Sequence, residues 1–127
     1  MTLDTAALYL AALLLLVVGM GHSYLGERYL LQRIFRRCEL PKIFGSSDYT
    51  RRILRFAWHL TTVAWLGLAG VLLLLAHPPA NPRTIALVVA LTFLVHGATS
   101  LVGARGKHYS WIPFLGVGLL AGWVALH

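Results

Sequence analysis

Four long apolar stretches, separated by three polar ones, run through the whole chain. The apolar stretches are residues 5–25, 56–76, 84–102 and 111–126. A helix that crosses the hydrocarbon core of a bilayer needs about 20 predominantly apolar residues, and the fourth stretch would reach about 24 Å if it were fully helical. The pattern therefore predicts an all-α integral membrane protein in which residues 1–127 form one domain, a bundle of four transmembrane helices.

The polar stretches predict the connections between these spans. Residues 77–82 contain three prolines, which forbid helix and predict a tight turn. Residues 27–55 form a longer loop. Within it, residues 27–37 alternate apolar side chains with arginines at helical spacing, so they either extend the first helix or lie flat on the membrane surface. Asp48 is expected to cap the helix that continues into the second span.

The basic residues are distributed unevenly over the three polar stretches. Ten of the eleven Lys and Arg residues lie in the first and third, and only Arg83 lies in the second. Lys and Arg are retained on the cytoplasmic side of membrane proteins. We therefore expect the first and third loops in the cytoplasm, both termini outside, and the bacterial inner membrane as the location.

Composition supports a membrane protein and narrows its partners. The chain is 58% hydrophobic with a mean hydropathy of +0.74, which is too apolar for a soluble domain. A net charge of +7 in a soluble protein would favour nucleic acid. Here the basic residues flank apolar spans, so we expect anionic lipid head groups at loop 27–55 and no nucleic acid. Cys38 is the only cysteine, and a reduced thiol is expected in that loop.

Two short similarities within the chain suggest an internal duplication. Residues 23–28 (SYLGER) resemble residues 100–105 (SLVGAR), and residues 65–67 (WLG) resemble residues 114–116 (FLG). A duplication would give two parallel helix hairpins related by a pseudo-twofold axis along the membrane normal. Chance similarity is the alternative.

Four of the six histidines are expected in the cytoplasmic half of the spans. Ionisable side chains are costly in a bilayer and often mark a functional path. Neutral imidazole is a common ligand of metals and of haem iron, and helix bundles hold such cofactors between facing helices. We therefore expect a site for haem b or a transition metal ion. Its candidate ligands are His22, His59 and His96, with His108 and Glu27 as further metal ligands.

Other residues near these histidines fit the same hypothesis. Arg51, Arg52 and Arg55 are candidates to pair with haem propionates. Glycines near the histidines would leave room for a flat macrocycle; they are Gly19, Gly21, Gly26 and Gly97. The alternative is structural: border histidines bond to water or to backbone carbonyls, and glycines allow close helix packing. Catalytic residues stay unassigned, because Ser23 and His22 are adjacent on a helix and do not face each other.

Three functions are compatible with these observations. The first is binding of haem b or a metal ion for electron transfer or cofactor handling. The second is a small oligomeric transporter or channel in which the histidines and Glu27 relay protons or ions. The third is an accessory subunit of a larger membrane complex, docked through the arginine-rich loop. A membrane enzyme acting on lipids or quinones stays open.

Overall fold

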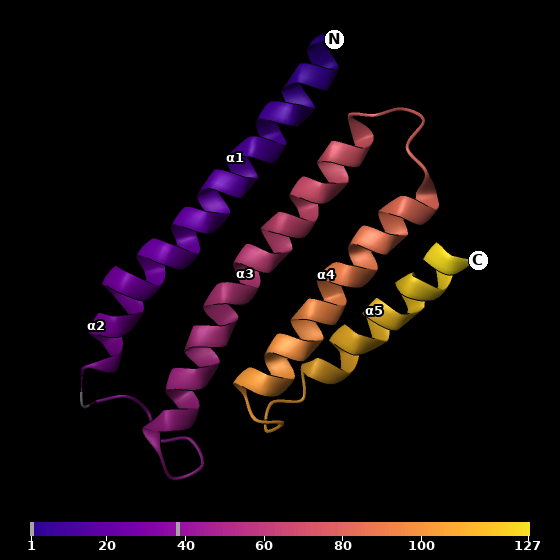
Figure 1. Ribbon diagram of the computed structural model, residues 1–127. Helices are drawn as coiled ribbons and strands as arrows, with labels where there is room; N and C mark the ends of the chain where they lie inside the picture. The colour runs from indigo at the N-terminus through magenta and orange to yellow at the C-terminus, as the bar shows by residue number, and fades with distance from the viewer. Residues whose placement is uncertain (1, 38) are drawn as a thin grey trace.

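The computed structural model describes residues 2–37 and 39–127, and the regular elements in these ranges are all helical (Figure 1). The all-α class is therefore confirmed. Cys38, for which a reduced thiol was expected, falls outside the described residues. The elements are α1 (Leu3–Leu25), the π-helix η1 (Gly26–Leu31), α2 (Gln32–Phe35), α3 (Ser47–Leu75), α4 (Pro82–Gly103) and α5 (Trp111–Leu126).

Three helices are long and apolar enough to cross a membrane. They are α3, α4 and the continuous helix Leu3–Phe35, which is 33 residues long and runs through α1, η1 and α2. The amphipathic stretch therefore extends the first helix as far as Phe35. The fourth apolar stretch forms α5, a shorter apolar helix of 16 residues. These spans support an integral membrane protein.

The connection between α3 and α4 lies where the sequence predicts it, whereas the start of α3 differs from the predicted one. The α3–α4 turn lies where the prolines predict it: α3 ends at Leu75, and α4 begins at Pro82. The Asn81 side chain caps α4 by accepting from the Arg83 backbone N–H at 2.9 Å. At the other end of α3 the prediction for Asp48 was wrong, because the helix begins at Ser47 and Asp48 already lies in its first turn.

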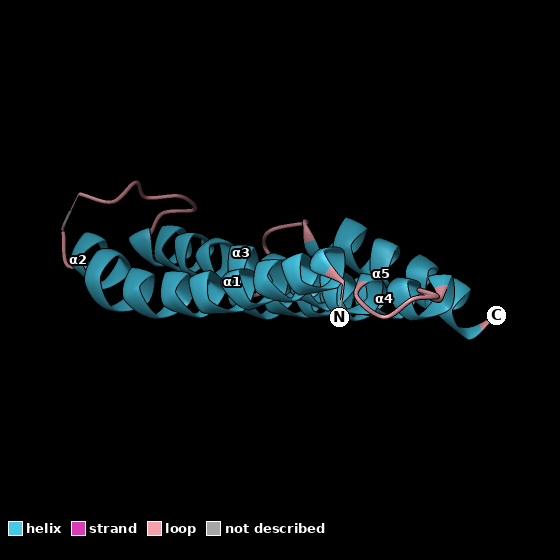
Figure 2. Ribbon diagram, turned by 90° about the horizontal axis from the view of Figure 1, so that it is seen from above, coloured by secondary structure: helices cyan, strands magenta, loops and turns pink. Residues whose placement is uncertain are grey.

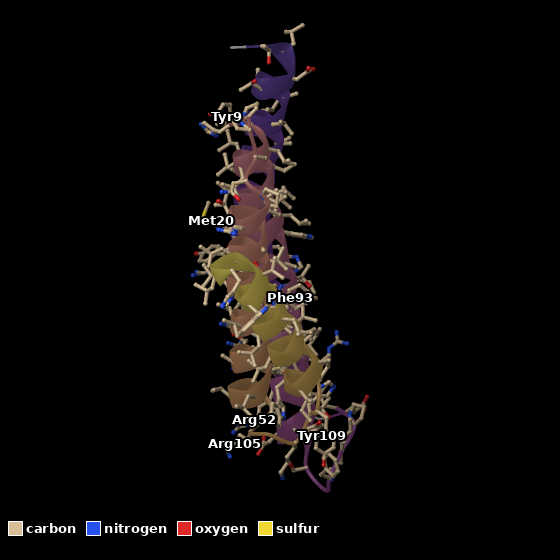
Figure 3. The ribbon with its side chains drawn as sticks, turned by 90° about the vertical axis from the view of Figure 1, so that its right-hand side faces the viewer. Tyr9, Met20, Arg52, Phe93, Arg105 and Tyr109 are labelled. Carbon is tan, nitrogen blue, oxygen red and sulfur yellow. The ribbon has the colours of Figure 1, made fainter. Side chains whose placement is uncertain are left out.

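The helices stand in an open row rather than around a common centre. Helices α1, α3, α4 and α5 pack in this order, each against its neighbour (Figure 1). Figures 2 and 3 view the molecule from two further directions and both show a flattened shape. Along the helix axes, the N-terminus, the α3–α4 turn and the C-terminus lie toward one end of the molecule. The two other connections lie at the opposite end, here called the basic end because their stretches carry ten of the eleven Lys and Arg residues.

Small residues line the contacts between the helices. The buried apolar side chains are mostly alanines, and the exposed ones are mostly leucines and valines. Helices in a lipid environment gain from close backbone approach rather than from burying large apolar groups. Between α4 and α5, a Cβ at Gly97 would collide with Leu115, and one at Gly118 would collide with Leu94. Large apolar side chains are therefore left for the lipid.

Candidate functional site

Two pairs of polar side chains face each other across the α1–α3 contact at the basic end. Ser23 and Glu27 lie four residues apart on the first helix, and Arg55 and His59 lie four apart on α3, so each pair occupies one helix face. Glu27 Oε1 lies 2.8 Å from Arg55 Nη2, and Arg55 Nε donates to Glu27 Oε2 at 3.1 Å. His59 Nε2 lies 3.5 Å from Glu27 Oε2, and His59 Nδ1 lies 2.8 Å from Ser23 Oγ.

The hydrogen bonds continue from Ser23 toward the middle of the helices. Ser23 Oγ lies 2.8 Å from Thr62 Oγ1, and Thr62 donates to the carbonyl oxygen of Gly19 at 3.2 Å. We call this set the α1–α3 network; it consists of Gly19, Ser23, Glu27, Arg55, His59 and Thr62. Its polar side chains satisfy one another, and its charged end is partly exposed, with 52% of the Arg55 side chain and 29% of the Glu27 side chain accessible.

Counting donors fixes the direction of the hydrogen bonds in the α1–α3 network. A carbonyl oxygen only accepts, so Thr62 donates its hydroxyl proton to Gly19. Ser23 then donates to Thr62, and His59 Nδ1 has to donate to Ser23. The His59 ring therefore lies between the two hydroxyls and the Glu27 carboxylate, which is 3.5 Å from Nε2.

The order serine, histidine, carboxylate also occurs in hydrolases, where the histidine activates the serine as a nucleophile. Ser23, however, lies inside a helix whose N–H groups are used by carbonyls about one turn earlier; the N–H of Gly26, for example, bonds to the carbonyls of His22 and Ser23. No backbone donor of the described helix is left beside Ser23 for an oxyanion. The geometry therefore suits a polar contact between helices rather than acyl transfer.

His59 also lines two clefts, one on each side of α3. The arginine cleft lies between α3 and α4 and measures about 410 Å³; it is lined by Arg51, Arg52, Arg55, Phe56, His59, Thr99, Val102 and Gly103. The second cleft, between the first helix and α3, measures about 550 Å³ and includes Ser23, Glu27, Arg28, Gln32 and Thr62 in its lining. Four of the six residues predicted to bind a cofactor thus share the arginine cleft.

Positive charge in the arginine cleft is only partly balanced. Arg55 pairs with Glu27, whereas Arg51 approaches Asp48 only to 3.8 Å. Arg51 Nε is buried and has no hydrogen-bond partner among the described residues. Leaving such a group unpaired costs free energy. The Arg51 side chain as a whole is 41% exposed, and guanidinium groups pair with carboxylate or phosphate.

His22 lies at the α1–α3 contact but outside the network. Its ring stacks on the indole of Trp58, and its Nε2 lies 3.3 Å from the Trp58 carbonyl oxygen. Trp58 occupies the space above Gly26, and Leu115 occupies the space at Gly97. The prediction that these two glycines leave room for a macrocycle was therefore wrong, because protein side chains fill that room.

The remaining candidate ligands lie in separate settings. His96 lies on α4 between Phe93 and Phe114, and its Nδ1 is 2.7 Å from the carbonyl oxygen of Thr92. His108 Nδ1 bonds to Ser110 Oγ at 2.7 Å in the α4–α5 connection. Among the described residues, no group of three or more His, Cys, Asp or Glu side chains is arranged to hold a metal ion. Of the five predicted metal ligands, His59 and Glu27 are brought together directly.

Sequence reasoning did not assign Ser23 or Thr62 to a site: Thr62 was expected only to bond within its own helix or across a helix contact, and Ser23 was compared only with the adjacent His22. The usable signal was the four-residue spacing of Ser23 and Glu27, which matches the spacing of Arg55 and His59. Comparisons of the chain with protein-family models, curated proteins and solved structures find no match. The two clefts are therefore the features of the chain that indicate a function.

Proposed function

We propose that this protein binds an anionic amphiphile within the membrane, with the acidic group of the ligand in the arginine cleft. The observation that carries the proposal is that three arginines line one cleft, and that one of them has a buried, unpaired Nε. Guanidinium groups bind phosphate and carboxylate through paired hydrogen bonds. An acidic head group would supply the missing acceptors.

The position of the arginine cleft along α3 suits an amphiphile. Arg51, Arg52 and Arg55 directly precede the apolar stretch that begins at Phe56, so they lie near the level of lipid head groups. Phe56 and Val102 give the cleft an apolar wall. The head group would contact the arginines while the hydrocarbon part follows the apolar surface of α3 and α4.

An acidic phospholipid is the first candidate, and haem b is the second. His59 Nδ1 bonds to Ser23, and Nε2 lies 3.5 Å from the Glu27 carboxylate, so haem iron at Nε2 would have to displace Glu27. Haem b stays a candidate because its propionates would match the same arginines and because His59 lines the cleft. Binding of acidic lipid favours the accessory role among the three functions considered.

A transport path through a single chain has less support. The α1–α3 network ends at Gly19, and residues 10–18 of α1, which lead on from there, are all apolar. A polar path across the membrane would therefore require further elements, such as those of a second copy.

The proposed topology has four spans, with the basic end in the cytoplasm of a bacterial cell and both termini outside. The charge asymmetry supports this orientation. Support for α5 as a span comes from its contacts with α4. Ser110, just before α5, bonds to Ser100, and the main-chain oxygen of His127, just after α5, accepts from Arg83. Helix α5, 16 residues long, therefore packs along most of α4, which has 22 residues.

Native mass spectrometry of the detergent-purified protein tests the proposal. The protein is offered palmitoyl-oleoyl phosphatidylglycerol or the zwitterionic phosphatidylcholine with the same chains. We expect the wild type to retain the acidic lipid preferentially and the double variant Arg51→Gln, Arg52→Gln to lose at least about tenfold in affinity, the value for one charged hydrogen bond. The matched control is Arg33→Gln, Arg36→Gln, which removes the same charge outside the cleft and should keep the preference.

Two results would separate the alternatives. Equal retention of both lipids, or equal losses in the two double variants, would contradict the arginine cleft as the site. An absorption spectrum of the same sample, before and after dithionite, tests haem b directly. A Soret band that is present in the wild type and absent in His59→Ala would show that the ligand is haem and not a phospholipid.

A further inference from the structure

His96 is a buried histidine with one unused ring nitrogen. Only 7% of the residue is exposed. Its Nδ1 lies 2.7 Å from the carbonyl oxygen of Thr92. Since a carbonyl only accepts, Nδ1 carries the proton, and Nε2 of the neutral ring presents a lone pair. No described residue donates a hydrogen bond to this nitrogen.

The ring lines a cleft that is otherwise almost entirely apolar. The cleft measures about 250 Å³ and lies between α3 and α4, apart from the arginine cleft; its walls include Ala64, Gly67, Leu68, Val88 and Phe93 (Figure 3 labels Phe93). The other polar side chain in the lining is Thr92, whose hydroxyl donates to the carbonyl oxygen of Val88 at 2.7 Å. Nε2 of His96 and the hydroxyl oxygen of Thr92 are therefore the two side-chain acceptors in this lining to which no described residue donates a hydrogen bond.

Nε2 of His96 would gain a hydrogen bond from a hydroxyl donor in this apolar setting, and the cleft has room for a molecule that supplies one. An apolar cavity of about 150 Å³ is large enough to bind benzene. A substituted six-membered ring would therefore fit this cleft, and a ring hydroxyl could reach the imidazole that lines it.

We propose that the His96 cleft binds a membrane-soluble aromatic ring that carries a hydroxyl group, of the quinol or phenol class. The hydroxyl donates to His96 Nε2, and the ring lies against the apolar walls beside Phe93. Gly67 and Ala64 have small or no side chains, so the α3 wall of the cleft is nearly flat. A flat wall suits a flat ring better than a branched head group. The inference is independent of the arginine cleft and of the lipid proposed there.

The hydrogen bond from Nδ1 of His96 to the Thr92 carbonyl oxygen gives this site a preference that can be measured. A quinol has hydroxyl donors, whereas the corresponding quinone offers only carbonyl acceptors. A carbonyl facing the lone pair of Nε2 gains no hydrogen bond and is repelled by it. We therefore expect the reduced form to bind about tenfold more tightly than the oxidised form, which corresponds to one hydrogen bond.

Anaerobic titration calorimetry of the full-length protein in detergent tests the proposal with decylubiquinol and decylubiquinone as probes. The wild type should prefer the quinol about tenfold. His96→Phe should abolish this preference, and the matched variant His108→Phe should retain it, because His108 lies in the α4–α5 connection outside this cleft. Equal affinities for the two probes in the wild type, or an unchanged preference in His96→Phe, would overturn the proposal.

A second variant tests the same cleft if His96→Phe does not fold. Ala64→Leu fills the cleft from α3 and leaves the imidazole in place. It should weaken both probes at least tenfold, and binding at wild-type strength would overturn the proposal. Retention of phosphatidylglycerol, measured on the same variants, should stay unchanged, so failure of this site and failure of the arginine cleft are distinguishable.

Discussion

The indole of Trp58 lies flat on the imidazole of His22, with the ring centroids 4.2 Å apart and the ring planes 5° apart. The two residues are also joined in both directions through their backbones: Trp58 Nε1 donates to the His22 carbonyl oxygen at 3.0 Å, and His22 Nε2 lies 3.3 Å from the Trp58 carbonyl oxygen. Gly26, one turn after His22, has no side chain to obstruct the indole. This contact fixes the register of α1 against α3, and with it the α1–α3 network.

Replacing Gly26 by alanine should destabilise the protein, because the added Cβ would collide with the Trp58 indole. Overpacking of this kind costs about 1–3 kcal/mol, which outweighs the gain of about 1 kcal/mol in helix propensity. Thermal unfolding in detergent, followed by circular dichroism, measures the change. Gly21→Ala is the matched control, since nothing lies within 4 Å of a Cβ there, and it should be neutral or stabilising. Equal destabilisation by both variants would contradict the contact.

The helices could be predicted from the sequence because their signals are local. The length of an apolar stretch, the three prolines before Arg83 and the basic residues beside the spans each act through neighbouring residues. The error at Asp48 was a single position, which is normal for a helix end. The grouping of Arg51, Arg52 and Arg55 in one cleft was predictable for the same reason, since they follow one another within little more than one turn of α3.

The partners of the histidines could not be predicted in this way, because they depend on how each helix is rotated against its neighbour. A rotation of α3 by about 100°, the step of one helical residue, would exchange the neighbours of His59. His22 was expected to face a cofactor, yet a tryptophan from α3 covers its ring. The internal duplication stays a prediction.

Removing the hydroxyl of Ser23 should destabilise the α1–α3 contact by about 1–2 kcal/mol, because both His59 and Thr62 lose a partner. A double-mutant cycle with Ser23→Ala and Thr62→Val should show a coupling energy of about 0.5–3 kcal/mol, as for residues of one network. Thr61→Val serves as the control, because its hydroxyl contacts only the carbonyl oxygen of Ala57 in its own helix. Additive effects of Ser23→Ala and Thr62→Val would show that the network is not coupled.

Close packing of α5 on α4 predicts a strong difference between two glycines. Gly97→Ala should cost about 1–3 kcal/mol, since the new methyl group would collide with Leu115. Gly116→Ala should be tolerated, because a Cβ at that position meets nothing within 4 Å. Unfolding of both variants in the same detergent gives the comparison. Tolerance of Gly97→Ala would mean that α5 does not hold this position against α4.

The orientation of the chain is open to a direct labelling experiment, because Cys38 is its only cysteine. If the basic end faces the cytoplasm, a membrane-impermeant maleimide added to intact spheroplasts should leave Cys38 unlabelled. In a second variant, Cys38→Ser with Ala80→Cys moves the thiol to the α3–α4 turn at the opposite end, where labelling is expected without permeabilisation. Both proteins should react after detergent is added, which controls for the reactivity of the thiols. The reverse pattern would place the ten basic residues outside the cell and would contradict the charge asymmetry on which the orientation rests.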